Sequence, residues 1–345
     1  MSDRRRWLRW GVRAAIPLGV AFNVGLALLS GEVSGREGWA RVPAEALLAG
    51  FALALVPWAF SAARLMLWTR FVGVSVRPLA ALRAVLEGIV GSAVTPTGSG
   101  GGAIKWGLAT RRGLPEGAGA ALLVIETIED AVFFALAIPL VVAVATAEFL
   151  AAGASLAQGT EVPPVVTGLV AGVGLVAGVA VVVWAGWRGW VGRRVRRALR
   201  RLAARARRRL AGPWAEARVT LGTAWREGRA VFALSLCLAA FQWGARYSVA
   251  WVVAHALGSS IPALLSWAFQ WLTQTAAGLI PTPGGVGGAE GAFAALYAPW
   301  VPDGKLGITT ATWRLTLYYL PLLLAGLLLA APWGRPRPPE PQEEA

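Results

Sequence analysis

The sequence predicts an all-α polytopic membrane protein, and composition, segment length and charge distribution all support this class. Of its 345 residues, 56% are hydrophobic and 15% are charged, whereas soluble domains carry about 25% charged residues. Its apolar runs are about 20 residues long, which suits bilayer-spanning helices and is too long for strands. The net charge is +15. The single cysteine and single histidine exclude an internal disulfide and a zinc cluster built on these residue types.

Eight apolar elements follow one another along a chain that we interpret as one membrane domain, 1–345. The first element, 14–30, follows five arginines, and no convincing cleavage site comes after it. We therefore interpret it as a retained helix rather than a signal peptide. The remaining elements cover approximately 45–68, 79–95, 118–146, 164–187, 231–257, 262–280 and 305–331.

Basic residues predict the side on which each loop lies, because Lys and Arg are retained in the cytoplasm. The N-terminus holds five arginines and segment 188–229 holds 14, whereas loop 147–163 has two glutamates and no basic residue. Arginines also flank the 79–95 run on both sides, which predicts a re-entrant hairpin at 79–112 that enters from the cytoplasm. A second hairpin at 262–302, entering from outside, leaves six crossings. Both termini are then cytoplasmic, in a bacterial or archaeal cytoplasmic membrane.

The two expected hairpins share a Gly/Pro pattern. Residues 95–102 read TPTGSGGG and residues 281–290 read PTPGGVGGAE, and an offset of 187 aligns them without a gap. Three crossings separate the hairpins, and an odd number inverts the second copy, as in many transporters. The sequence therefore predicts an inverted repeat. Its parts are the first half 10–146, a connecting span 164–187, a basic cytoplasmic linker 188–229, the second half 231–331 and a cytoplasmic tail 332–345.

Breaks in membrane helices must be buried in protein or line a wet cavity, because bare backbone groups cannot face lipid. A broken helix also presents an N-terminus, which attracts anions such as phosphate. The alternative is that Gly and Pro merely let the hairpins turn and pack closely. A G-x-G-x-x-A match at 98–103 has no strand before it, so we do not interpret it as a dinucleotide site. The candidate substrate residues of the breaks are Thr95, Pro96, Gly98, Gly100, Gly101, Pro281, Thr282, Pro283, Gly284, Gly285, Gly287 and Gly288.

Ionisable residues at membrane depth form the second group of candidates, because each is expensive to insert and needs a partner or water. Three acids share one helical face by their i, i+3, i+4 spacing, and we expect two deep cations, Arg246 and Arg314, to oppose them. Glu87 and Glu290 are the expected titrating acids. Structural ion pairs are the alternative for any single residue. The complete set is Glu87, Lys105, Glu126, Glu129, Asp130, Arg246, Glu290 and Arg314.

The arginine-rich segment 193–209 could in principle bind nucleic acid. Its position between spans, with tryptophans at its ends, favours an interfacial helix on anionic lipid instead. We therefore expect membrane lipids as partners, with an anionic lipid headgroup as substrate. We expect no nucleic acid, no metal and no cofactor, and homo-oligomerisation is left open.

The residues Leu279–Glu290 resemble the P-x-P-G-G-x-G-x-x-E signature of the flippase-like membrane family, which includes the transmembrane region of lysylphosphatidylglycerol synthetases. The first break, together with Lys105 and Gly113, is similar to that family's first Gly/Pro element, and Arg314 is similar to the arginine of its last helix. The resemblance covers roughly residues 10–331. Members often carry Glu-Arg-x-x-Asp, whereas Thr127 holds the Arg place here. The chain has no room for an aminoacyltransferase domain, so the resemblance implies lipid handling without synthetase activity.

Together these features lead us to expect transbilayer translocation of a phosphate-bearing lipid or polyprenyl-phosphate-linked glycan by alternating access. One alternative is a membrane-embedded lipid-modifying enzyme that uses Glu290 or the 126–130 acids as base. The absence of a paired metal-ligand motif and of a histidine-based nucleophile system weighs against it. Another alternative is an accessory or scaffold subunit that transports nothing.

Overall fold

The structure is a computed structural model that describes residues 42–95, 100–110, 113–156, 212–279, 282 and 284–331. Every regular element in these ranges is helical, which confirms the all-α membrane class. Two of the helices, Ala44–Phe71 and Leu306–Ala330, are long and apolar enough to cross a bilayer. The bent pair Gly212–Glu227 and Arg229–Ala256 adds a third if it is counted as one span. The number of crossings stays a prediction.

Several of the expected elements lie outside the described residues. These are the first helix 14–30, the span 164–187, the linker up to residue 211 and the tail 332–345. Residues 96–99, 111–112, 280, 281 and 283 within the two Gly/Pro regions also lie outside them.

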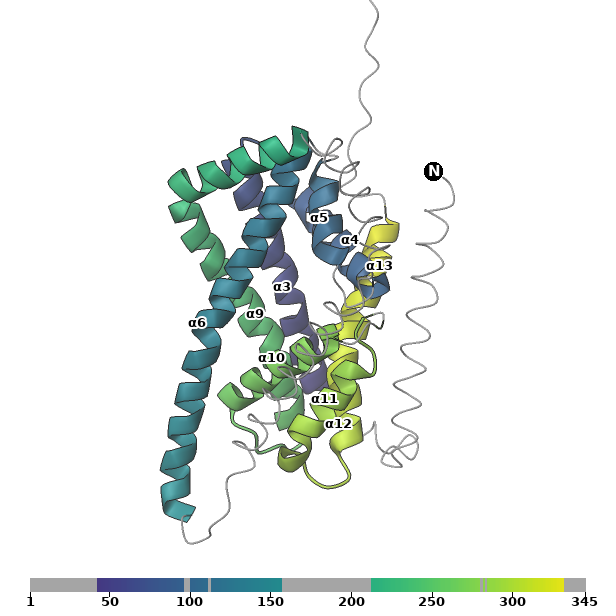
Figure 1. The fold of residues 1–345 in the computed structure, drawn as a ribbon. Helices are drawn as coiled ribbons and strands as arrows, with labels where there is room; N and C mark the ends of the chain where they lie inside the picture. The colour runs from purple at the N-terminus through teal and green to yellow at the C-terminus, as the bar shows by residue number, and fades with distance from the viewer. Residues whose placement is uncertain are drawn as a thin grey trace, which may run out of the picture.

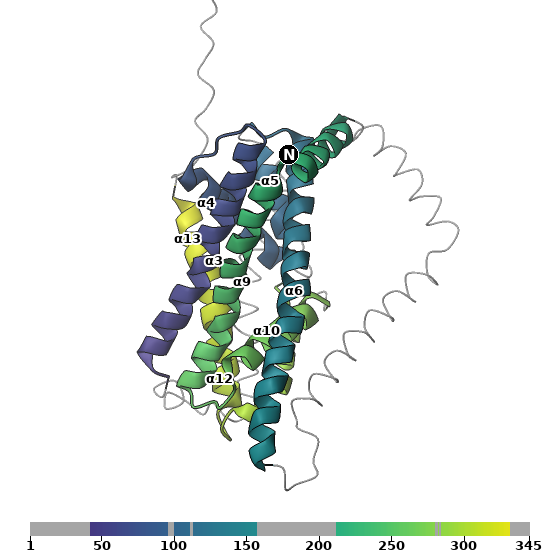
Figure 2. The same ribbon diagram turned by 90° about the vertical axis from the view of Figure 1, so that its left-hand side faces the viewer.

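Two equally long helices form the centre of the molecule. Helices α3 (Ala44–Phe71) and α9 (Arg229–Ala256) have 28 residues each and pack along one another, with the longer α6 (Glu116–Leu156) beside them (Figures 1 and 2). Small side chains allow this approach: a Cβ on Gly50 would lie 3.3 Å from Val253 Cγ2. Because lipid is as apolar as the helix surfaces, such close packing stabilises membrane helix pairs where hydrophobic burial does not.

The first Gly/Pro region is a broken helix. Helix α4 (Pro78–Val94) ends before Thr95, and α5 (Gly100–Thr110) then packs back against α4. Thr95 is extended, with ψ of 141°, as expected for a residue before proline. Both helices lie in the upper half of Figure 1. The chain therefore turns within the bundle at the place where the sequence predicts a break.

The second Gly/Pro region is broken in a similar way. Helix α10 (Ala263–Leu279) is followed by α11 (Gly288–Tyr297), which packs against it and continues into the short 3₁₀ helix η1 (Ala298–Trp300). Helices α10 and α11 lie in the lower half of Figure 1. Between them Gly284 and Gly285 have φ of 65° and 66°, a left-handed conformation that glycine adopts without steric cost.

The last element is a single helical rod with an irregular centre. Helix α12 (Leu306–Arg314) continues as the π-helix η2 (Leu315–Tyr319) and then as α13 (Leu320–Ala330). Segments of π-helix inside longer helices are frequent at functional sites. The π-helix places Tyr318 beside the second break, since a Cβ on Gly284 would lie 1.9 Å from the Tyr318 hydroxyl oxygen.

The buried apolar residues form one large cluster for each half of the described chain. One cluster includes Trp106 and Leu122 and joins α3, α4, α5 and α6. The other includes Phe293 and Trp313 and joins α9, α10, α11 and α12, with Ala54 of α3 also part of it. A smaller cluster around Trp58 connects α3 and α4 with α13. Each broken helix is thus packed mainly within its own half.

A surface helix, Gly212–Glu227, lies across one end of the bundle at 91° to α9 (Figure 1). Its Trp214 and Trp225 side chains are exposed. The helix is fixed to the bundle by Glu216, whose Oε2 accepts the Gly117 N–H at the start of α6 (3.0 Å). Exposed tryptophans at the end of an apolar bundle are typical of the membrane interface.

The close contact between α4 and α5 predicts different effects for two glycines of α5. A Cβ on Gly101 would lie 2.0 Å from Ser92 Oγ and 2.8 Å from Gly88 O, whereas a Cβ on Gly107 would meet nothing within 4 Å. We expect Gly101→Ala to lower the free energy of unfolding by about 1–3 kcal/mol through overpacking. The matched control Gly107→Ala should raise it by about 0.5–1 kcal/mol. Thermal unfolding in detergent measures both, and equal melting temperatures would contradict the packing role.

Candidate functional site

A cavity of about 640 Å³ lies where both broken helices meet the central helices. Pockets that hold small ligands typically measure about 300–1,000 Å³. Ser92 from α4, and Gly284 and Gly285 from the second break, contribute to its wall. The cavity is therefore bounded by both Gly/Pro regions at once.

Aromatic side chains form much of the cavity wall. Phe134 of α6 contacts two aromatic residues of α9, with ring centroids 4.9 Å from Trp243 and 5.8 Å from Tyr247. These contacts fix the wall on the α6 and α9 side. The aromatic lining residues are Trp58, Phe134, Trp243, Tyr247, Trp271 and Tyr318.

The buried ion pair between Glu290 and Arg314 holds the second break against the last helix. Arg314 Nε lies 2.9 Å from Glu290 Oε1, and Arg314 Nη2 donates to Gly284 O (2.6 Å). The guanidinium also stacks over the Tyr318 ring, 4.2 Å from its centroid. Arg314, at the start of the π-helix, thus contacts the loop of the second break through Gly284, the acid Glu290 and the cavity-wall residue Tyr318.

At each break, a side chain of the hairpin accepts a hydrogen bond from a backbone N–H at the start of the next helix. Thr95 Oγ1 accepts the Gly100 N–H (3.1 Å) at the start of α5. Glu290 Oε2 accepts the Gly287 N–H (2.7 Å) at the start of α11, which is the Glu half of a capping box, because Gly287 has no side chain to make the reciprocal bond. The sequence predicts free N–H groups there for an anion. These two amides instead have partners within their own hairpin.

Arg246 is the charged side chain of the cavity that has no acidic partner. It projects from α9, is partly exposed and lines the cavity. Within the described residues it makes no ion pair and no hydrogen bond at the distances that define these contacts. Arg314 lines the same cavity, but Glu290 balances its charge. The cavity therefore contains a cation whose counter-charge does not come from the described protein.

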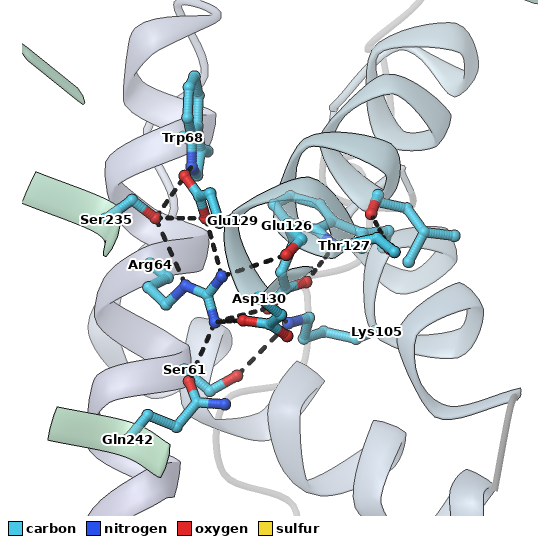
Figure 3. Close-up of polar contacts among 12 residues, drawn as sticks. Ser61, Arg64, Trp68, Lys105, Glu126, Thr127, Glu129, Asp130, Ser235 and Gln242 are labelled. Atoms are coloured by element: carbon cyan, nitrogen blue, oxygen red, sulfur yellow. Dashed lines mark hydrogen bonds and ion pairs between the residues drawn. The ribbon is translucent and has the colours of Figure 1, made fainter. Parts of the chain in front are cut away.

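A second polar cluster lies beside the cavity and is centred on Arg64 of α3 (Figure 3). Arg64 Nη2 lies 2.8 Å from Glu129 Oε2, and Arg64 Nη1 lies 2.9 Å from Asp130 Oδ1. Glu129 also accepts hydrogen bonds from Trp68 Nε1 (2.9 Å) and Ser235 Oγ (2.7 Å). Helices α3, α6 and α9 are thus connected through one buried carboxylate.

Lys105 extends this cluster to the first broken helix. Its Nζ forms an ion pair with Glu126 Oε1, and Trp106 Nε1 donates to Glu126 Oε2 (2.8 Å). Lys105 Nζ also donates to Ser61 Oγ (3.4 Å), and Ser61 lines the cavity. The cluster therefore reaches the cavity wall without exposing its own acids there.

The three acids on one face of α6 do meet cations, but not the expected ones. Their partners are Arg64 and Lys105 rather than Arg246 and Arg314. Arg64 is not among the candidates predicted from the sequence, although it falls inside the 45–68 apolar run. Ser61 and Trp68, three and four residues away, share its helical face, and this spacing is the signal that could have identified it. Thr127 faces outward from α6 and donates to Leu123 O (2.8 Å).

The remaining candidates are placed away from the cavity or outside the described part of the chain. Glu87 pairs with Arg83, four residues before it (3.2 Å), and is not a lining residue. Thr282 Oγ1 donates to Val286 O (2.8 Å) within the second break. Gly288 is the first residue of α11. Pro96, Gly98, Pro281 and Pro283 lie outside the described residues.

Neither polar region is arranged as a metal centre. In the part of the chain that the structure describes, no group of three or more His, Cys, Asp or Glu side chains could hold a metal ion. The acids of the Arg64 cluster already accept from nitrogen and hydroxyl donors. What the arrangement offers instead is a cavity lined by two arginines, by amide and hydroxyl groups and by aromatic faces.

Comparison with known sequences agrees with this architecture. Residues 16–325 match the family described as the lysylphosphatidylglycerol synthase TM region. A UPF0104 membrane protein of Archaeoglobus fulgidus is 24% identical over 281 residues, which cover 79% of this chain and 82% of that protein. Because the family match covers most of the sequence, this chain belongs to the lysylphosphatidylglycerol synthase TM region family.

Proposed function

We propose that this chain translocates a phosphate-bearing lipid between the leaflets of a bacterial or archaeal cytoplasmic membrane. The substrate is a phospholipid or a polyprenyl-phosphate-linked glycan. The single observation that carries the proposal is the cavity between the two broken helices, which Arg246 lines without an ion pair to any described residue. A phosphate group supplies that charge, and arginine binds phosphate through its planar fork of N–H donors.

The helix bounds support an internal repeat with the offset found in the sequence. Adding 187 to the bounds of α3 gives 231–258, close to Arg229–Ala256 of α9. The same shift takes α4 to 265–281 and α5 to 287–297, close to Ala263–Leu279 of α10 and Gly288–Tyr297 of α11. Helices of the first half thus recur at one constant spacing, apart from shifts of one or two residues.

Helix packing supports the same correspondence, because equivalent helices of the two halves contact equivalent neighbours. Helix α4 packs on α3, α5 and α13, and its counterpart α10 packs on α9, α11 and α6. The Trp106–Glu126 contact in the first half corresponds, at offset 187, to Phe293 and Trp313, whose rings stack at 4.4 Å. We therefore propose six crossings and two re-entrant hairpins related as inverted repeats.

Alternating access follows from this arrangement. Each broken helix packs mainly on its own half, but α4 also contacts α13 and α10 also contacts α6, so in this proposal these two contacts between the halves change when one half rocks against the other. Inverted repeats that meet near the bilayer midplane expose a shared site to one side at a time. In this proposal the cavity between the halves holds the headgroup while the lipid tails remain in the bilayer.

The alternative of a membrane-embedded enzyme is less well supported by the geometry. Glu290 accepts the Gly287 N–H and pairs with Arg314, and neither it nor the acids of the Arg64 cluster lines the cavity. A general base must lie within hydrogen-bond reach of the proton that it removes. A scaffold without transport would not need an unbalanced cation inside the bundle, where charge is expensive.

The role of Arg246 is tested by translocation of a fluorescent phosphatidylglycerol in liposomes that contain the purified chain. We expect Arg246→Gln to slow translocation about 10-fold or more, because a charge-assisted hydrogen bond contributes about 1.5–3 kcal/mol. Arg246→Lys should retain part of the rate, since it keeps the charge but not the fork. Arg77→Gln, at an exposed arginine before α4, is the matched control and should leave the rate unchanged. Equal rates for Arg246→Gln and Arg77→Gln would refute the headgroup role.

The inverted topology is tested by labelling single cysteines in intact cells after Cys237→Ala. Arg77→Cys and Glu116→Cys mark the two ends of the first hairpin, and both residues are exposed. Ser260→Cys and Asp303→Cys mark the corresponding ends of the second hairpin and are also exposed. We expect the first pair to react only with reagents that reach the cytoplasm. The second pair should react with membrane-impermeant reagents from outside, and a hairpin whose two ends label from opposite sides is a full crossing.

A further inference from the structure

We infer that Asp130 of α6 is a proton-binding site coupled to the cavity. Its carboxylate takes up one proton from water when a phosphate headgroup binds Arg246, and it releases that proton when the headgroup leaves. The lipid and the proton then cross the membrane together. This inference rests on the proposed function and adds its source of energy, a proton gradient across the membrane.

The three acids of α6 differ in how well the protein compensates them (Figure 3). Glu129 accepts hydrogen bonds from three side chains of α3 and α9, and Glu126 accepts from the Lys105 ammonium and an indole of α5. Within the described residues, the one ion-pair partner of Asp130 is Arg64, which Glu129 shares. The Asp130 side chain is also 27% exposed, against 12% for Glu126 and 0% for Glu129. Asp130 is therefore the surplus acid of the cluster.

Asp130 lies at the boundary between the Arg64 cluster and the cavity. It is four residues before Phe134 on the same face of α6, and Phe134 lines the cavity. On α9 the lining residues Trp243 and Tyr247 face it, and Tyr247 is within electrostatic reach of both Asp130 and Arg246. The Asp130 carboxylate therefore responds to the charge that the cavity holds.

A bound phosphate changes the electrostatic surroundings of Asp130. Without an anion in the cavity, Arg246 attracts the Asp130 carboxylate from the other side of Tyr247. A phosphate on Arg246 cancels this attraction and brings a second negative charge, so that protonation of Asp130 restores the balance. Because coupling between two binding events is reciprocal, a proton on Asp130 strengthens phosphate binding by the same factor. Proton and lipid thus favour each other's binding, as coupled transport requires.

The other charged and titratable groups near Asp130 come from every helix that packs on this part of α6, apart from α10. Helix α10 has no ionisable residue, and the surface helix contacts α6 at Gly117, more than three turns before Asp130. Ion pairs or hydrogen bonds already engage both cations of the cluster. The groups around Asp130 are Arg64, Lys105, Glu126, Glu129, Arg246 and Tyr247.

Proton uptake is measured by isothermal titration calorimetry of dioctanoyl phosphatidylglycerol into the purified full-length chain, in buffers of different ionisation enthalpy. This lipid is a phosphodiester without a second ionisation near neutral pH, so any proton taken up belongs to the protein. We expect uptake of about 0.5–1 proton per bound lipid, and an affinity that rises by up to about 10-fold for each unit by which the pH falls. The affinity should level off at low pH, where Asp130 is protonated before the lipid binds.

Asp130→Asn identifies the group that takes up the proton. This variant leaves two acids for the two cations of the cluster, so we expect it to fold, as judged by gel filtration and circular dichroism. Its proton uptake should be close to zero and its affinity for the lipid independent of pH. The matched control is Asp303→Asn, at an exposed acid outside the cavity, and it should take up as many protons as the unmodified chain. Unchanged uptake in folded Asp130→Asn would reject the assignment of Asp130.

Coupling to transport is tested in liposomes with an imposed pH gradient, which requires no variant of the protein. Fluorescent phosphatidylglycerol should accumulate in the leaflet that faces the alkaline side, beyond the level in protein-free liposomes with the same gradient. A protonophore should abolish the additional accumulation, and Asp130→Asn should lack it.

Failure of the inference can be distinguished from failure of the proposed function. Translocation that ignores the gradient, with no proton uptake on binding, would overturn the inference and leave a lipid carrier. Binding with proton uptake but without translocation would overturn the proposed function and leave the proton site. No binding of phosphatidylglycerol and no translocation would overturn both.

Discussion

The rest of the structure depends on one constraint: a helix can break inside a bilayer only if its exposed backbone groups find partners within the protein. The two breaks meet this constraint with side chains of their own. Thr95 and Glu290 accept amides at the starts of α5 and α11, and Arg314 donates to the Gly284 carbonyl. Residues that look like ligand contacts in the sequence therefore stabilise the frame of the cavity. None of these described contacts needs a ligand.

The buried charges are divided between two neighbouring regions with different roles. In the Arg64 cluster, Arg64 and Lys105 pair with the three acids of α6, which also accept hydrogen bonds from α3, α5 and α9, so the cluster has one carboxylate more than it has cations. Breaking a buried pair by removing one partner costs about 3–5 kcal/mol, so this cluster holds the first broken helix to the scaffold. In the cavity beside it, Arg246 forms no ion pair with any described residue. Ser61 and Gln242 belong to both regions, so the Arg64 cluster supports the wall of the cavity.

How much could be predicted from the sequence depended on whether each feature is local. The breaks at Thr95 and near Gly284 follow from Pro and Gly, which act on their own backbone, and the offset of 187 anticipates the matching helix bounds. Ion-pair partners are not local: Arg64 and Glu129 are 65 positions apart, and their contact depends on how α3 and α6 pack. The sequence indicates that Arg246 is a deep cation, but that none of the described acids pairs with it depends on how the described helices pack. The contact of Glu290 with the Gly287 N–H is local, since a Glu three residues after an N-cap can reach back to its amide.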